Sequence, residues 1–199
     1  MNQIEPSGDT SLCRACGFGH ETIAKYLIEL GADINQVDEH YYCKTPLCKA
    51  SEYKNENIVK YLVEQGTDLN FCDPLVYACE KGNEEIVKYL LEHRADVNQT
   101  NFCKETPLGK ACWNEALVKY LIEHGVNNDQ LRDGLCQACN NWNDNVSLVN
   151  YLVKHWDDVN YKSDHLIHMA IKGLNKDVVK YLMKKMNREF SESDYEEKT

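Results

Sequence analysis

Three residues near the N-terminus have the types and the spacing of a zinc site. Cys13, Cys16 and His20 lie in the stretch CRACGFGH, which has the C-x2-C-x3-H spacing of a zinc knuckle. A second Cys-x2-Cys pair follows at Cys136 and Cys139. Because zinc binds thiolate and imidazole groups, one hypothesis is a thiol-rich metal-binding protein. A redox-responsive protein that uses its ten cysteines is the related alternative.

An internal repeat offers another explanation for these cysteines. A Tyr-Leu pair recurs six times, in stretches such as AKYLIELGADIN and VKYLVEQGTDLN, and an alanine lies upstream of each pair. The tyrosines are Tyr26, Tyr61, Tyr89, Tyr120, Tyr151 and Tyr181, and the alanines are Ala15, Ala50, Ala78, Ala111, Ala138 and Ala170. In four of the six copies the two residues are 11 positions apart. The chain is therefore a tandem array of one structural unit.

Each unit predicts two short helices. The first has an aliphatic residue three positions before the alanine, at Leu12, Leu47, Leu75, Leu108, Leu135 and Ile167. Helix N-cap types precede it at Thr10, Thr45, Asp73, Thr106 and Asp133, and proline occupies the first turn at Pro46, Pro74 and Pro107. The second helix is expected to end at a left-handed glycine, at Gly31, Gly66 and Gly125, with Arg94 and Trp156 in that place elsewhere.

Several stretches resemble the ankyrin repeat. KTPLCKA, ETPLGKA and HLIHMA are similar to its T-P-L-H-x-A signature, and IVKYLLEHRADVN resembles its second helix and exit loop. The resemblance covers residues 8–187 and implies an all-α repeat solenoid of stacked helix-turn-helix ankyrin repeats with short β-turn fingers. The repeats are expected at residues 8–37, 38–72, 73–99, 100–128, 129–161 and 162–187, in one domain over residues 10–187. We expect a flexible lead-in at residues 1–9 and an acidic disordered tail at residues 188–199.

In this register the cysteines fall mainly at packing positions. Cys16, Cys79, Cys112 and Cys139 follow the repeated alanine, and Cys13, Cys48 and Cys136 share a second position. Free cysteine behaves as a small buried hydrophobic residue, so packing explains the spacing, and we predict neither a metal nor a cofactor. Cys43, Cys72 and Cys103 fall in loops between repeats, where we expect exposure.

Charge and composition narrow the choice of partner and location. The chain has 22 basic and 32 acidic residues, a formal net charge of −10. Such a surface repels phosphate groups, so we expect no nucleic acid or membrane partner, whereas a partner protein with a basic surface is compatible. No apolar run approaches the roughly 18 residues of a membrane span, and no secretory signal is visible. The cysteines are therefore expected to remain free thiols in the cytoplasm or nucleus.

No catalytic motif is visible. The seven histidines do not form an H-E-x-x-H motif, and neither G-x-S-x-G nor a P-loop occurs. We predict that the protein is not an enzyme.

The resemblance to ankyrin repeats implies a protein-protein interaction module. Its concave face, made of the fingers and the exposed side of each first helix, is expected to bind a partner protein and act as scaffold, adaptor or occluding inhibitor. A monomer is expected. The candidate contacts are Glu52, Tyr53, Glu80, Lys81, Trp113, Asn114, Asn140 and Asn141 after the first helices, and Tyr41, Tyr42, Phe71, Phe102 and Lys104 at the fingertips. Tyr53 and Trp113 are the strongest because exposed aromatic residues are enriched in binding hot spots. The alternative for Trp113 is packing within the fourth repeat, whose interhelix loop is two residues short.

Overall fold

The computed structural model describes residues 10–37, 44–140, 145–156 and 163–185. These ranges contain twelve helices and no β-strand. The chain divides into two compact units, Met1–Lys110 and Ala111–Thr199, and each is described by itself. The predicted lead-in, the predicted tail and Cys43 lie outside the described residues. The single repeat domain over residues 10–187 stays a prediction.

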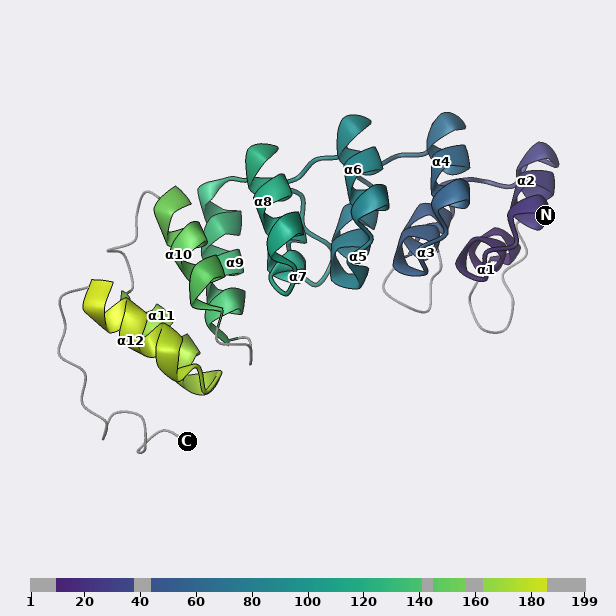
Figure 1. Ribbon diagram of the computed structural model, residues 1–199. Coiled ribbons are helices and arrows are strands. Elements are labelled where there is room, and N and C mark those ends of the chain that lie inside the picture. Colours follow the sequence, from purple (N-terminus) through teal and green to yellow (C-terminus); the bar gives the residue numbers. More distant parts are fainter. Residues whose placement is uncertain (1–9, 38–43, 141–144, 157–162, 186–199) are drawn as a thin grey trace. The chain divides into compact units, whose positions relative to one another are not determined.

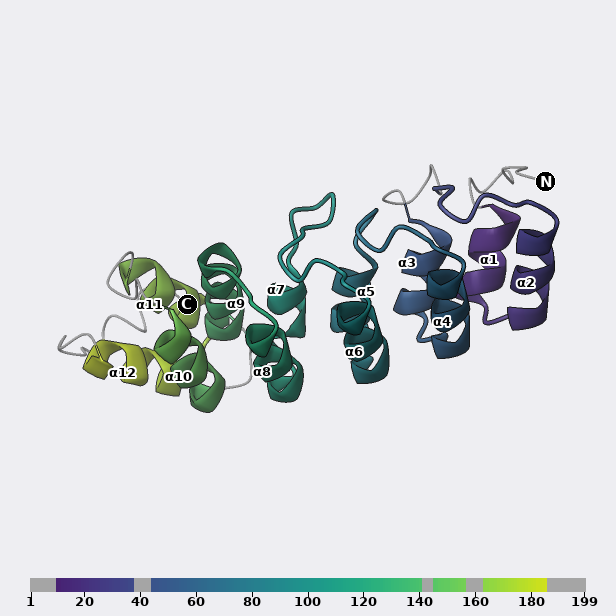
Figure 2. The same cartoon turned by 90° about the horizontal axis from the view of Figure 1, so that it is seen from above.

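Unit 1 consists of helix pairs. They are α1 (Ser11–Gly17) with α2 (Glu21–Glu29), α3 (Pro46–Glu52) with α4 (Glu56–Glu64), and α5 (Pro74–Lys81) with α6 (Glu84–Glu92), followed by α7 (Pro107–Ala111). Helices α1, α3 and α5 pack side by side, and α2, α4 and α6 form a second layer (Figure 1). The loops from α4 to α5 and from α6 to α7 lie on the side of the first helices (Figure 2). This arrangement confirms the predicted stacking of helix-turn-helix units.

Unit 2 continues the same pattern. It contains α8 (Glu115–Glu123), α9 (Asn128–Asn140), α10 (Val146–His155), α11 (Ser163–Lys172) and α12 (Lys176–Lys185). Helix α9 packs against α10 and α11, and α12 packs against α10 and α11. None of the described helices is both long enough and apolar enough to span a membrane.

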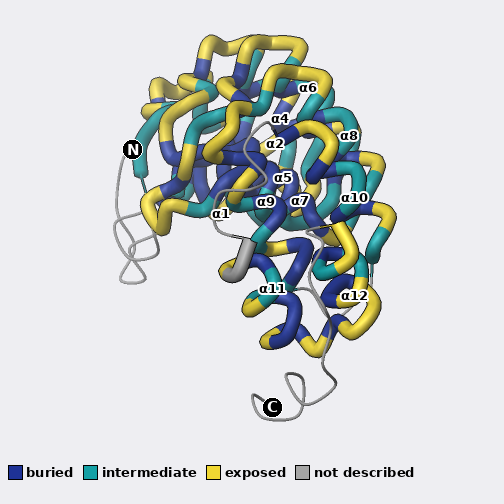
Figure 3. Tube along the Cα trace, turned by 90° about the vertical axis from the view of Figure 1, so that its left-hand side faces the viewer, coloured by how far each residue is buried: buried dark blue, intermediate teal, exposed yellow. Residues whose placement is uncertain are grey.

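The repeated positions form the core. The predicted aliphatic residues of five first helices are buried, at Leu12, Leu47, Leu75, Leu108 and Leu135, and so are all six repeated alanines. The leucine after each repeated tyrosine is also buried in five of the second helices, at Leu62, Leu90, Leu121, Leu152 and Leu182. Figure 3 shows that buried and exposed residues alternate along second helices such as α6. In the last repeat the predicted position is wrong, because Leu166 is buried there and Ile167 is half-buried.

Three of the predicted N-caps are confirmed. The hydroxyls of Thr10, Thr45 and Thr106 each accept a hydrogen bond from the backbone N–H three residues later, at 3.1, 3.2 and 2.8 Å. Each bond satisfies a helix-terminal N–H that has no partner within its own helix.

One predicted N-cap is wrong, and another has the predicted position without the capping hydrogen bond. Asp133 lies inside α9, which begins a turn and a half earlier, and there the Asn127 side chain accepts a hydrogen bond from the Gln130 N–H at 3.0 Å. Asp73 precedes α5 in a left-handed conformation (φ 51°) and its side chain makes no capping hydrogen bond. The start of the helix changes only in the fifth repeat, because α5 still begins at Pro74, directly after Asp73.

The second helices end in two ways. Gly31, Gly66 and Gly125 are left-handed, with φ of 85°, 80° and 91°, and Arg94 adopts the same conformation at 72°. Trp156 does not: its backbone is extended (φ −101°) and its side chain is buried. The expected left-handed exit therefore applies to Arg94 and not to Trp156.

An asparagine before the second helix links neighbouring repeats. The Asn55 side-chain amide donates hydrogen bonds to the carbonyls of Cys16 and Gly17 in the preceding repeat, at 2.7 and 3.0 Å. The Asn175 amide donates to the Cys139 carbonyl at 2.6 Å. These bonds satisfy carbonyls at the ends of first helices, which have no partner within the helix.

Candidate functional site

The fingers of unit 1 are built on a repeated Asp-x-Asn turn. The carboxylates of Asp33, Asp68 and Asp96 each accept a hydrogen bond of 2.9 Å from the backbone N–H two residues later. This local bond closes each turn without a β-strand.

Asparagine side chains connect one finger to the next. The Asn35 side-chain oxygen accepts hydrogen bonds from the Thr67 hydroxyl at 2.8 Å and from the Asp68 N–H at 3.0 Å. The Asn70 side-chain oxygen accepts one from the Asp96 N–H at 2.8 Å. The finger bases in unit 1 are therefore held in a fixed relation to each other.

Phe102 lies at the tip of a tightly bonded finger and is 63% exposed. The Asn101 side-chain oxygen accepts hydrogen bonds from the N–H groups of Cys103 and Glu105 at 3.0 and 2.9 Å. The Lys104 N–H donates to the Asn101 carbonyl at 2.8 Å, and Lys104 is left-handed (φ 59°). These bonds fix the turn that presents Phe102.

The finger between the second and third repeats is short, and its two neighbouring residues Phe71 and Cys72 differ in exposure to solvent. Phe71 is 40% exposed, whereas Cys72 is buried against Cys48 and Tyr77. The Cys48 thiol donates a hydrogen bond to the Cys72 carbonyl at 3.0 Å. The expected exposure of Cys72 is therefore wrong, because the loop is too short to project from the body of the unit. Cys103 is exposed, as expected.

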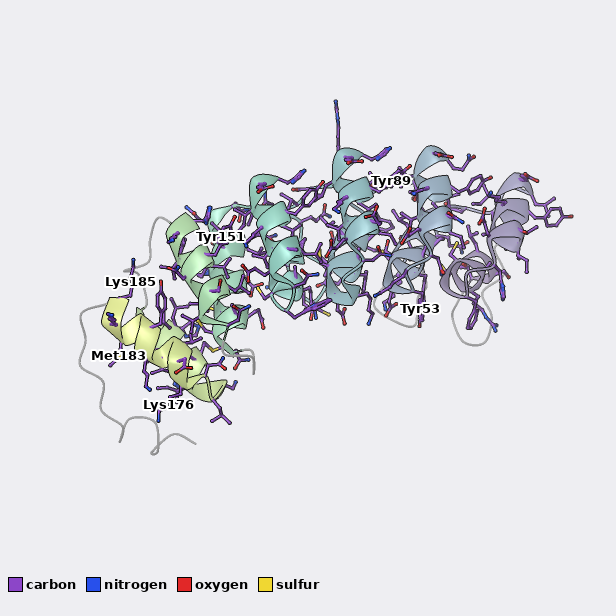
Figure 4. The ribbon with its side chains drawn as sticks, in the orientation of Figure 1. Tyr53, Tyr89, Tyr151, Lys176, Met183 and Lys185 are labelled. Atoms are coloured by element: carbon purple, nitrogen blue, oxygen red, sulfur yellow. The ribbon has the colours of Figure 1, made fainter. Side chains whose placement is uncertain are left out.

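Tyr53 and Glu52 are adjacent but have different surroundings. Tyr53 ends α3 and is 59% exposed, and its ring lies 3.7 Å from where a Cβ on Gly17 would be (Figure 4). The Glu52 carboxylate instead forms an ion pair of 2.7 Å with Lys44, whose ammonium lies 4.6 Å from the centre of the Tyr77 ring. Tyr53 is thus available to a partner, whereas Glu52 is engaged within the unit.

The remaining candidates are polar or lie in unit 2. Glu80 and Lys81 form a surface ion pair of 3.6 Å at the end of α5. Trp113 is 52% exposed. The Asn114 side chain caps α8 by accepting hydrogen bonds from the N–H groups of Ala116 and Leu117. Asn140 is the last residue of α9 and is half-buried. Tyr41, Tyr42 and Asn141 lie outside the described residues.

A second row of aromatic residues, on the second helices, has partners within the protein. The Tyr89 and Tyr151 rings, labelled in Figure 4, contact the His93 and His155 rings at a tilt of 32° and 42°, with centroids 4.1 and 4.3 Å apart. The Lys119 ammonium lies 5.5 Å from the centre of the Tyr151 ring. The Tyr–His contacts lie within one helix and its end, whereas the lysine contact links the neighbouring helices α8 and α10. The repeated tyrosines are visible in the sequence, but their pairing with histidine was not predicted, although the recurring Tyr-x3-His spacing is a signal for it.

The buried thiols are poorly suited to metal binding or nucleophilic chemistry. Burial raises the pKa of the Cys16 and Cys79 thiols far above the usual range and raises the pKa of Cys48 and Cys139 to about 12. Zinc binding and thiol chemistry need the thiolate, which burial disfavours. No three His, Cys, Asp or Glu side chains that could hold a metal come together in the ranges the structure describes.

The comparisons with known proteins agree with the repeat architecture. A family model for ankyrin repeats (3 copies) matches residues 1–73, 47–132 and 75–163, which together span more than half of the chain. No curated protein matched the chain. Ankyrin repeats are typically non-catalytic and are generally protein-protein interaction modules. The chain belongs to the ankyrin repeat family.

Proposed function

We propose that this protein binds a partner protein through the finger and first-helix side of unit 1, with Tyr53 and Phe102 as the main contacts. The observation that carries the proposal is the exposure of these aromatic side chains, at 59% and 63%, together with Phe71 at 40%. Exposed aromatic residues supply much of the binding energy in protein interfaces because they bury a large area on association.

Both main contacts have rigid supports. The Tyr53 ring lies beside Gly17 at the end of α1, and Phe102 is presented by the hydrogen-bonded turn around Asn101. Side chains that are already positioned lose less conformational entropy when a partner binds. A face of this kind is suited to holding one epitope, so we propose a scaffold, adaptor or occluding inhibitor that acts as a monomer.

The charge of the same side favours a basic epitope. The finger carboxylates of Asp33, Asp68 and Asp96 lie at the finger bases, and the whole chain has a net charge of −10. Complementary charge speeds encounter and selects among partners more than it adds affinity. We therefore propose that the partner presents lysine or arginine around an apolar patch.

The test compares two tyrosines of equal exposure. Tyr53 is 59% exposed on the proposed face, and Tyr26 is 60% exposed on α2 in the other layer. Wild type, Tyr53→Ala/Phe102→Ala and Tyr26→Ala are used to capture proteins from lysate, and affinities for each captured protein are then measured. We expect the double variant to weaken binding at least about thirtyfold and Tyr26→Ala to leave it unchanged.

The outcomes separate the surfaces. If all three proteins bind equally and melt at the same temperature, the proposed face is not the binding site. Loss only with Tyr26→Ala would move the site to the second helices. Trp113→Ala is measured separately as the test of a contact in unit 2.

A further inference from the structure

The solvent-facing stripe of the last helix has the opposite charge from that of the earlier helices. Four second helices carry Glu-Lys-Glu at positions four residues apart: Glu21, Lys25 and Glu29; Glu56, Lys60 and Glu64; Glu84, Lys88 and Glu92; Glu115, Lys119 and Glu123. In α12 the same three positions are Lys176, Lys180 and Lys184. The inversion is specific, because the buried residues of α12, such as Leu182, keep the repeat pattern.

The usual pattern stabilises a helix, and the inverted one does not. Lys25 pairs with Glu21 at 2.6 Å and Lys119 with Glu115 at 2.7 Å, each one turn apart. A glutamate in the first turn also suits the positive end of the helix dipole. In α12 the first turn carries Lys176 beside Asp177, so the aspartate suits the helix dipole, whereas Lys176 and the like charges one turn apart along the stripe are unfavourable locally. A partner of negative charge would offset both effects.

The lysines form an exposed set, which we name the lysine stripe: Lys172, Lys176, Lys180, Lys184 and Lys185. Figure 4 shows Lys176 and Lys185 at the two ends of α12. Within the described residues no ion pair involves Lys180, Lys184 or Lys185.

The segment with the complementary charge follows the stripe in the sequence. Residues 165–188 contain six basic residues and one acidic residue, whereas residues 189–199 contain five acidic residues and one basic residue. The acidic residues are Glu189, Glu192, Asp194, Glu196 and Glu197, and we name Glu189–Glu197 the acidic segment. The first 164 residues contain 15 basic and 26 acidic residues, so they repel a long external polyanion.

We propose that the lysine stripe is the docking site of the acidic segment of the same chain. The segment begins four residues after α12 ends, at Lys185. Nine extended residues reach about 30 Å, and a ten-residue helix is about 15 Å long, so the segment can run back along the whole stripe. Covalent attachment gives the segment an effective concentration of roughly millimolar, which favours it over a free acidic peptide.

The contact depends on salt. Lysines one turn apart are separated by about 6 Å along the helix, which is within the screening length of about 8 Å at physiological ionic strength. The stripe therefore acts as one positive field at low salt and loses this property at high salt. Docking leaves the stripe closed to other anions, and the segment acts as an internal competitor for them.

Zero-length carbodiimide cross-linking of the full chain tests the contact directly. Equal amounts of unlabelled and 15N-labelled protein are mixed, treated at 50 mM and at 500 mM salt, and mapped by mass spectrometry. We expect isotopically uniform links between the stripe and the acidic segment, reduced at least about fivefold at high salt. Cross-links between a labelled and an unlabelled peptide would show that the segment binds a second copy of the chain. The absence of cross-links would show that the contact does not form, and either result overturns the proposal.

A matched variant restores the common pattern. Lys176→Glu/Lys184→Glu gives α12 the Glu-Lys-Glu sequence of α4 and keeps Lys180. We expect it to keep its helical circular dichroism and lose the links to Lys180. Unchanged links to Lys180 would contradict docking on the stripe.

A binding measurement provides an independent test that leaves the folded repeats untouched. The variant E189Q/E192Q/D194N/E196Q/E197Q neutralises the acidic segment, and the probe is a fluorescent peptide of ten glutamates. We expect this variant to bind the probe about tenfold more tightly than wild type, and the same variant with Lys176→Glu/Lys184→Glu to lose that gain. Equal affinity of wild type and the neutralised variant would overturn the proposal.

Discussion

The second and third repeats of unit 1 have closely similar second helices but differ at both of their ends. Helices α4 and α6 each have nine residues and bury the same three positions, Ile58, Val59 and Leu62 in one and Ile86, Val87 and Leu90 in the other. The second repeat opens with the capping Thr45 and exits at the left-handed Gly66. The third opens with the uncapped, left-handed Asp73 and exits at the left-handed Arg94.

The difference shows which interactions hold a repeat in place. The second repeat satisfies the local rules where its first helix begins and its second helix ends, although Lys54 after α3 is left-handed (φ 62°), at the place where the third repeat has Gly82. It also packs against its neighbours. The third repeat breaks two local rules, because it lacks a cap and has side chains at two left-handed positions. It keeps the same helices because its core positions are buried against neighbouring repeats, as expected for an array whose stability depends on stacking.

The largest effects should be the same in both repeats. Leu62→Ala and Leu90→Ala each remove a fully buried side chain, so each should lower the free energy of unfolding by about 2 to 5 kcal/mol. Urea denaturation followed by circular dichroism measures both. Clearly unequal losses would show that the two cores do not contribute alike.

The second effect depends on pH and belongs to the third repeat. Burial, with the Asp96 carboxylate nearby, raises the pKa of Asp73 to about 7 from its ordinary value of 3.8. The folded state then holds the proton more tightly than the unfolded chain between about pH 4 and pH 7, so stability falls as pH rises through this window.

Asp73→Asn removes this dependence and keeps a residue type that tolerates a left-handed backbone. We expect the variant to be more stable than wild type by at least about 1 kcal/mol at pH 8 and similar to it at pH 4. Thermal melts at both pH values measure the difference. A stability difference between Asp73→Asn and wild type that is the same at both pH values would contradict the raised pKa of Asp73.

The next effect distinguishes the N-terminal ends of the first helices α3 and α5 in the two repeats. Thr45→Ala removes the cap of α3 and should cost about 1 kcal/mol of stability. Asp73→Asn removes no capping hydrogen bond and keeps a residue type that tolerates the left-handed backbone, so it should not show this loss above pH 7. Urea denaturation at pH 8 checks both variants, and an equal loss in the two would show that Asp73 supports α5 after all.

The smallest effect distinguishes the left-handed residues that follow the second helices α4 and α6. Arg94→Gly relieves a side chain in the left-handed region and should raise stability by about 0.5 to 1 kcal/mol, and Gly66→Arg should lower it by about the same amount. Chemical denaturation of both variants measures the pair. If neither variant changes stability, the backbone conformation at these exits carries no strain.

Much of the fold could be predicted because the same structural position occurs several times in a repeat array, and each copy shows which residue types that position accepts. The alanine and tyrosine of the repeat occur in six copies, four of them with the 11-residue spacing of Ala50 and Tyr61, and the buried positions around them follow a helical period. The same register explained the Cys13 and Cys16 pair as packing residues, and it placed Tyr53, Phe102 and Trp113 where the structure finds them exposed.

Two of the predictions that were wrong lie where connections change length. Asp133 fell inside a helix, and Cys72 was buried because the short finger holds it against the core. A repeat pattern aligns helices, but it does not show how a loop of unusual length closes.

The sequence by itself determined the repeat register, the helix pairs and the charge inversion on α12, because these follow from residue type and spacing alone. Only the tertiary structure decided that Asn35 and Asn70 join neighbouring fingers, that Asn55 reaches the preceding repeat, and that Trp156 leaves its helix extended. These features depend on distances between residues about 25 to 40 positions apart in the chain, and such distances are fixed only when the repeats stack.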